Sequence, residues 1–67
     1  MNITELRYLV AIKKWGSVSA AAKQLYAAQP NVSKALKNLE GEYGLRIFER
    51  SSTGMIPTEQ GRRFIEQ

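Results

Sequence analysis

Two helical segments separated by only three residues are the feature of this sequence that most restricts its fold. Ser17 is a strong N-cap for the first segment, which is expected over residues 18–26. Pro30 favours the first turn of the second, because amides in that turn have no intrahelical acceptor. Residues 27–29 leave room only for a tight turn, and short side chains on the first helix let the second approach closely. The sequence therefore predicts a helix-turn-helix.

The segment before this motif predicts another helix, over residues 3–15. Asn2 and Glu5 form the pattern of a capping box, and Gly16 is a typical stop signal. Its apolar residues recur at helical spacing and predict one broad apolar face: Ile3, Leu6, Leu9, Val10 and Ile12. Trp15 has two open interpretations, which are shielding of the core beside the last helix and contact with a second subunit.

The second half of the chain predicts a helix, a hairpin and the start of a further helix. The helix covers about residues 29–43 and ends at Gly44. A strand over 45–49 and an edge strand over 55–57 flank turn residues 51–54. Thr58 caps a last helix from Glu59. The expected buried side chains of the third helix are Val32, Ala35, Leu36, Leu39 and Tyr43. Phe64 and Ile65 begin an apolar face on the last helix.

Composition argues against an enzyme. The chain has neither cysteine nor histidine, so the side chains that most often bind zinc or move protons near neutral pH are missing. Serine and threonine hydroxyls have no base to activate them. Glu40 and Glu42 are two residues apart and face different directions on a helix, unlike a catalytic pair. We expect no catalytic residue, no metal site and no cofactor.

The chain also lacks membrane and export signals. No apolar run approaches the roughly 20 residues that span a bilayer. The N-terminus, Met1 to Glu5, has an acidic residue and no basic region, so it is not a secretory signal. We expect a cytoplasmic protein without membrane contact, and the helix still open at Gln67 suggests part of a longer one.

The exposed face of the third predicted helix fits double-stranded DNA. Gln29, Asn31 and Ser33 can hydrogen-bond base edges, and Lys34 and Lys37 can reach guanine or phosphate. The face has no acidic residue until position 40, and the net charge of +4 favours an anionic partner. A simpler interpretation of these lysines is a solvated helix face.

An ordered set of residues resembles the N-terminal domain of LysR-type transcriptional regulators, which is a winged helix-turn-helix. The similarity covers all 67 residues without a gap. Its carriers are Leu6-Arg7-Tyr8, Ser17, Ala20-Ala21-Ala22, Leu25, Gln29-Pro30, Val32-Ser33-Lys34, Leu39-Glu40, the stretch from Gly44 to Ser51 with Phe48-Glu49-Arg50, Gly54, Thr58 and Gly61.

The resemblance implies a mainly α fold, with a winged helix-turn-helix DNA-binding domain over residues 1–58 and the start of a dimerisation (linker) helix over 59–67. It implies a bacterial, sequence-specific regulator of transcription that forms homodimers or homotetramers. A small-molecule effector would act only through a C-terminal domain that this sequence does not contain. The implied DNA-binding residues lie on the third helix and in a wing over residues 50–54: Gln29, Pro30, Asn31, Ser33, Lys34, Lys37, Arg50, Ser51, Ser52 and Thr53.

Two positions depart from the family pattern, and several site residues have structural alternatives. Ala28 stands where the family commonly has a capping Ser or Thr, and Thr53 where a wing arginine is frequent. Gln29 and Pro30 could serve only the turn and the first helical turn. Arg50 could pair with Glu49 or Glu59 at the surface.

Two other classes of function remain as alternatives. A winged helix used as a protein-interaction module would show a hydrophobic or acidic third helix, and this face is neither. A small enzyme would need an activated acid-base pair, and none is visible in the sequence.

Overall fold

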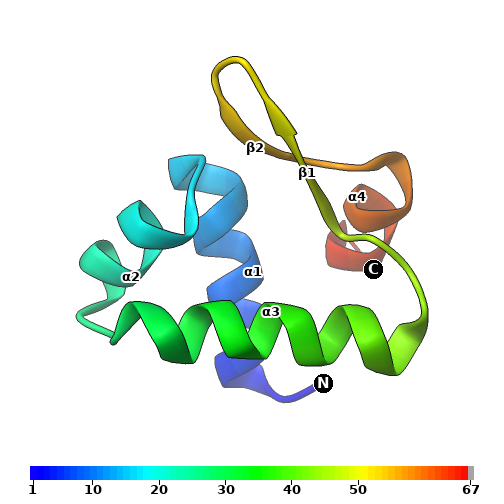
Figure 1. Cartoon of the computed structure of the whole chain (residues 1–67). Helices are drawn as coiled ribbons and strands as arrows, with labels where there is room; N and C mark the ends of the chain where they lie inside the picture. Colours follow the sequence, from blue (N-terminus) through cyan, green and yellow to red (C-terminus); the bar gives the residue numbers. More distant parts are fainter. Residues whose placement is uncertain (67) are drawn as a thin grey trace.

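Local capping signals set both ends of the first helix. The computed structural model describes residues 1–66, and α1 (Ile3–Trp15) is the first of its elements (Figure 1). The Asn2 side chain accepts a hydrogen bond from the Glu5 amide at 2.8 Å, and the Glu5 carboxylate accepts one from the Asn2 amide at 3.0 Å. Gly16, in the left-handed region at φ 83°, ends α1. The predicted capping box and helix bounds are therefore confirmed.

The turn between α2 (Val18–Leu25) and α3 (Gln29–Tyr43) is shifted by one residue from the prediction. Ser17 caps α2 as expected, since its hydroxyl accepts from the Ala20 amide at 3.0 Å. Tyr26 does not continue the helix because its backbone is left-handed at φ 55°, and its amide closes the last turn. The tight turn is thus residues 26–28, and Pro30 is the second residue of α3.

The hairpin pairs β1 (Phe48–Ser51) with β2 (Gly54–Pro57) in antiparallel register, Phe48 opposite Pro57 and Ser51 opposite Gly54. The predicted first strand, residues 45–49, is wrong in its bounds, because β1 begins three positions later and ends two positions later. Ile47 is not in the ladder because its amide donates to the Glu40 carboxylate at 2.8 Å and its carbonyl accepts from the Thr58 amide at 3.0 Å.

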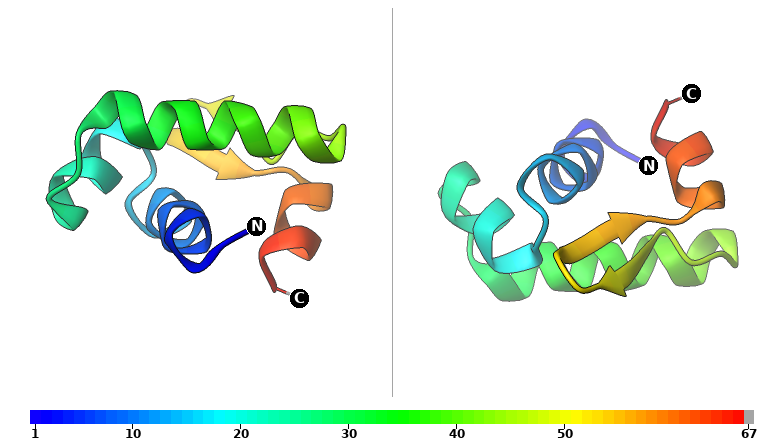
Figure 2. Two further views of the ribbon diagram at one scale, coloured as in Figure 1. Left: turned by 90° about the horizontal axis from the view of Figure 1, so that it is seen from below. Right: turned by 90° about the horizontal axis from the view of Figure 1, so that it is seen from above.

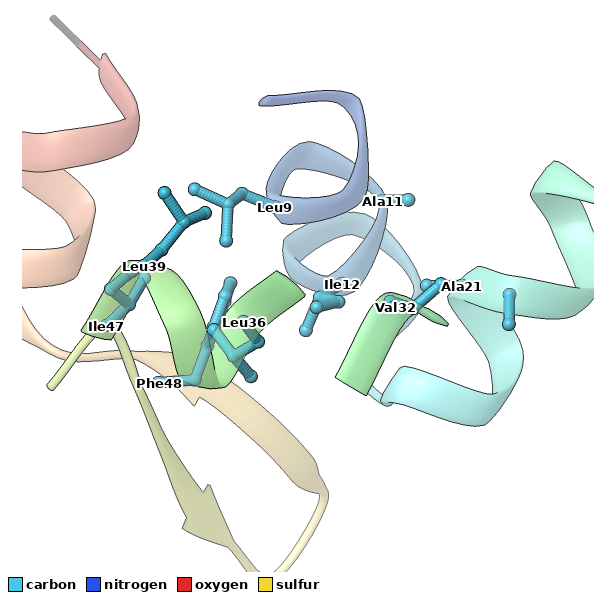
Figure 3. Close-up of a cluster of buried hydrophobic side chains, with 10 residues drawn as sticks. Leu9, Ala11, Ile12, Ala21, Val32, Leu36, Leu39, Ile47 and Phe48 are labelled. Carbon is cyan, nitrogen blue, oxygen red and sulfur yellow. The ribbon is translucent and has the colours of Figure 1, made fainter. Parts of the chain in front are cut away.

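The hydrophobic core lies where α1, α2 and α3 meet the start of the hairpin (Figure 3). Its largest fully buried side chains are Leu9, Ile12, Val32, Leu39 and Ile47. Of the broad apolar face predicted for α1, only the inner residues enter this core. Ile3 and Val10 remain 75% and 47% exposed. Tyr43 is also exposed, with its ring edge-on to Phe64 at 4.8 Å between centroids.

The last helix, α4 (Glu59–Glu66), begins against the backbone that precedes β1. Thr58 caps it by accepting from the Gly61 amide at 2.9 Å, as predicted. A side chain at Gly61 would place its Cβ 1.9 Å from the Ile47 carbonyl oxygen, so only glycine allows this approach. Phe64 and Ile65 pack partly buried against the core. Figure 2 shows α3 on one side of the bundle and the N-terminus and α4 on the other.

Three packed helices with a two-stranded hairpin between α3 and α4 make the predicted mainly α, winged helix-turn-helix fold. Among the described residues, no helix is both long and apolar enough to cross a membrane.

Candidate nucleic-acid interface

Three segments distant in sequence surround one open hollow of about 370 Å³: the turn between α1 and α2, the first turns of α3, and the hairpin, which is the wing. The lining residues are Gly16, Ser17, Val18, Ser19, Gln29, Ser33, Arg50, Ser51, Gly54 and Met55. Four of the predicted site residues, Gln29, Ser33, Arg50 and Ser51, are therefore brought together here.

The other predicted residues do not line this hollow. Pro30, Asn31, Lys34 and Lys37 are exposed on α3, and Ser52 and Thr53 are exposed at the tip of the wing. The opposite side of α3 is anchored in the core through Val32, Leu36 and Leu39. Because a helix repeats every 3.6 residues, this anchoring holds the polar side of α3 toward solvent.

The interface is electropositive. Within residues 1–66 the ion pairs are Lys13 with Glu66 and Arg63 with Glu59, so the cations at positions 34, 37 and 50 have no carboxylate partner there. The alternative pairing of Arg50 with Glu49 or Glu59 is therefore not formed. Unpaired, exposed cations can neutralise phosphate without first breaking an ion pair.

The wing is held in place by its backbone. The Met55 amide donates to the Gly16 carbonyl at 2.7 Å, which fastens β2 to the turn before α2. Gly54, at φ 129°, makes this approach possible, because a Cβ there would lie 2.6 Å from the same oxygen. Ser51 stabilises the turn: its hydroxyl lies 2.9 Å from the Gly54 carbonyl and 3.3 Å from the Thr53 amide.

The start of α3 has no side-chain cap, as the alanine at position 28 led us to expect. The amide of Asn31 instead donates to the Ala28 carbonyl at 3.0 Å. The backbone amide of Gln29 lies in the first turn of α3, so its N–H group has no acceptor within the helix.

Sequence reasoning missed the contribution of residues 16–19 and of Met55. Ser17 was recognised only as a cap, and Ser19 is an exposed polar residue in the first turn of α2. Their place in the hollow depends on the hydrogen bond between Met55 and Gly16. This bond joins residues far apart in the sequence, so no local sequence pattern predicts it. Trp15, 45% exposed, lines a groove between α1 and α2, so shielding of the core beside α4 is wrong.

This structure is a winged helix-turn-helix domain, because the hairpin after α3 is hydrogen-bonded to the turn before α2. Residues 3–62 match the model of the bacterial regulatory helix-turn-helix proteins of the LysR family. The chain belongs to this family.

Known proteins agree along the whole chain. YcgK of Bacillus subtilis, named an uncharacterized HTH-type transcriptional regulator, is 42% identical over 67 residues, which are 100% of this chain and 21% of that protein. The HTH-type transcriptional regulator TfdS of Cupriavidus pinatubonensis is 41% identical over 66 residues, 98% of this chain and 22% of TfdS. The chain thus spans about a fifth of these curated relatives.

Solved structures give the same result. The CbnR DNA-binding domain in complex with DNA superposes with a TM-score of 0.88 at 35% identity, over 98% of this chain and 76% of that one. The BenM DNA-binding domain in complex with benA site 1 DNA has a TM-score of 0.89 at 38% identity, over 98% of this chain and 77% of that one.

Proposed function

We propose that this domain binds double-stranded DNA with sequence specificity and thereby regulates transcription. The observation that carries the proposal is the solvent-facing side of α3, where amide and lysine side chains project beside the wing without a carboxylate partner in the described chain. The DNA complexes of the structural neighbours support it.

The proposed DNA-binding residues divide into those that contact phosphates and position the domain on the duplex, and those that read the bases. Arg50 and the wing hydroxyls of Ser51, Ser52 and Thr53 contact phosphates, which fixes the register without reading sequence. On α3, which enters the major groove, Gln29, Asn31 and Ser33 contact base edges, and Lys34 and Lys37 reach guanine or phosphate. Pro30, in the first turn of α3, lies against the DNA without reading a base. The wing lacks a long cation at position 53, so its phosphate contacts depend mainly on Arg50.

The proposal extends to the whole regulator. α4 begins the helix that pairs two subunits of a homodimer or homotetramer, so that two copies of α3 read a two-fold site. The protein acts in the cytoplasm and catalyses no reaction, and a small-molecule effector binds to a C-terminal domain outside this chain.

Selection of bound sequences from a random duplex pool tests the proposal. We expect a consensus sequence to emerge. Lys34→Ala should weaken binding to it, and if Lys34 meets phosphate, the log-affinity against log-salt slope should fall by about 0.9.

Lys13→Ala is the matched control, because it removes the same charge from a lysine that pairs with Glu66 at 3.3 Å on another part of the surface. Enrichment of no sequence, or an equal loss for both variants, would leave α3 without a role in recognition.

A further inference from the structure

The outer side of α1 carries an apolar face that the core does not use. Leu9 and Ile12 are fully buried, whereas Ile3, Val10 and Trp15 are 75%, 47% and 45% exposed. The helix therefore has two apolar faces, and the outer one is covered by no described residue.

This outer face forms one wall of a groove of about 390 Å³. The groove is lined by Ile3, Leu6, Arg7, Val10, Ala11, Lys14 and Trp15 of α1 and by Leu25 of α2. It shares no residue with the hollow beside the wing. Figure 2 shows α3 on one side of the bundle and the N-terminal part of α1 on the other. A ligand in this groove can therefore bind while α3 contacts DNA.

The spacing of the lining residues fits a helical ligand. On α1 they occupy positions 3, 6, 7, 10, 11 and 14, the alternation of three and four residues that forms the contact row of two packed helices. The row extends over about 17 Å, at about 1.5 Å per residue, and so matches about three turns of a docked helix. Apolar anchors at the same spacing are what a helix needs to bind in such a groove.

The charge of the groove specifies an acidic ligand. Arg7 and Lys14 border the apolar floor, and neither pairs with a carboxylate in residues 1–66. Lys14 Nζ lies 5.1 Å from the centre of the Trp15 ring, a cation–π contact that holds a positive charge at one end of the groove. The carboxylate of Glu5, the acidic residue in the first turn of α1, is bound to the Asn2 amide in the capping box.

We propose that this groove is a docking site for a short, acidic, amphipathic helix of a protein partner. Leucine-like side chains of that helix would fill the floor between Ile3, Val10 and Leu25, and its carboxylates would face Arg7 and Lys14. The domain then has two binding sides, one for DNA and one for protein.

Trp15 is the only tryptophan of the chain, so its fluorescence reports the groove directly. The probe is a synthetic peptide of Leu and Glu, about 14 residues long, with leucines at helical spacing. Its counterpart has Lys in place of Glu. We expect the acidic peptide to shift the Trp15 emission to the blue and to saturate, and the basic peptide to bind at least about tenfold more weakly, equivalent to about 1.4 kcal/mol.

Two matched variants locate the binding. Val10→Gln should weaken acidic-peptide binding by about tenfold or more, as for an anchor at the centre of an interface. Ile56→Gln is the control. Ile56 is 44% exposed, a fraction similar to the 47% of Val10, but it lies on β2 and does not line the groove. Arg7→Gln with Lys14→Gln should abolish the preference for the acidic peptide. Both single variants should keep the parental circular dichroism.

Equal binding of the two peptides, an equal loss in both single variants, or an unchanged emission would overturn the proposal. If Trp15 emission and sedimentation instead change with protein concentration alone and Val10→Gln removes the change, the occupant is a second copy. Val10→Gln should retain DNA binding. A failure of the groove proposal can then be distinguished from a failure of the proposed DNA recognition.

Discussion

Gly54→Ala is the most informative single substitution. It should break the contact between the wing and the turn before α2 without changing a charge. Gly54 has a φ of 129°, a conformation that side chains rarely adopt. A new Cβ would lie 2.6 Å from the carbonyl oxygen of Gly16, a backbone atom that cannot rotate away. The wing must therefore move, and the 2.7 Å hydrogen bond from Met55 to Gly16 must break.

The expected loss follows from two contributions. The unfavourable φ costs about 1–3 kcal/mol, and forcing a methyl group into a packed contact costs about 1–3 kcal/mol. Together they give about 2–6 kcal/mol, against a total of roughly 3–10 kcal/mol for a domain of this length. Gly54→Ala should thus remove a large share of the stability.

Urea unfolding followed by Trp15 fluorescence measures this change. Gly41→Ala is the control, because Gly41 lies inside α3 and a Cβ there meets nothing within 4 Å. Alanine favours a helix interior over glycine, so this control should gain about 0.5–1 kcal/mol. A Gly54→Ala domain as stable as the parent would refute the reasoning that the wing is fastened at Gly16.

Further predictions concern Lys34 and the helix caps. If Lys34 reads guanine rather than phosphate, Lys34→Ala should lose about 1–3 kcal/mol only on sites carrying that base, which a panel of mutated duplexes would reveal. Ala28→Ser should raise the unfolding free energy by about 0.5–2 kcal/mol, toward the low end because the Asn31 amide already has a backbone partner; an unchanged urea midpoint would contradict it. Thr58→Ala should lower stability by about 0.5–2 kcal/mol through loss of the cap on Gly61, and Thr58→Ser should restore it.

The helices could be predicted from sequence because their ends depend on neighbouring residues. Asn2, Ser17 and Thr58 each accept from an amide three residues ahead, and such short-range contacts leave a pattern in the sequence. β1 could not be placed as well. The alternation at residues 45–49 was interpreted as a strand. However, the neighbours Ile47 and Phe48 are both buried, which breaks the alternation, and of these two residues only Phe48 pairs with β2.

The candidate site likewise has parts that could be predicted from local sequence patterns and parts that depend on contacts across the fold. The exposed face of α3 follows from helical periodicity, so its polar residues could be named in advance. The turn at Gly16 enters the hollow only because β2 is hydrogen-bonded to it across the fold. The outer face of α1 was missed for a related reason, since periodicity showed a broad apolar helix without showing how much of it the three-helix core can cover.

The contact of Gly61 with Ile47 has a consequence for motion. The Cβ position of Gly61 falls 1.9 Å from the Ile47 carbonyl oxygen, and the Thr58 amide donates to the same oxygen at 3.0 Å. Ile47 leads directly into β1, so backbone contacts, without flexible side chains between them, join the first turn of α4 to the base of the wing. We therefore expect rotation of α4 to displace the base of the wing, and local unfolding of the two segments to occur together. The Thr58 and Gly61 amides should exchange their hydrogens with solvent at a common rate, in one cooperative event.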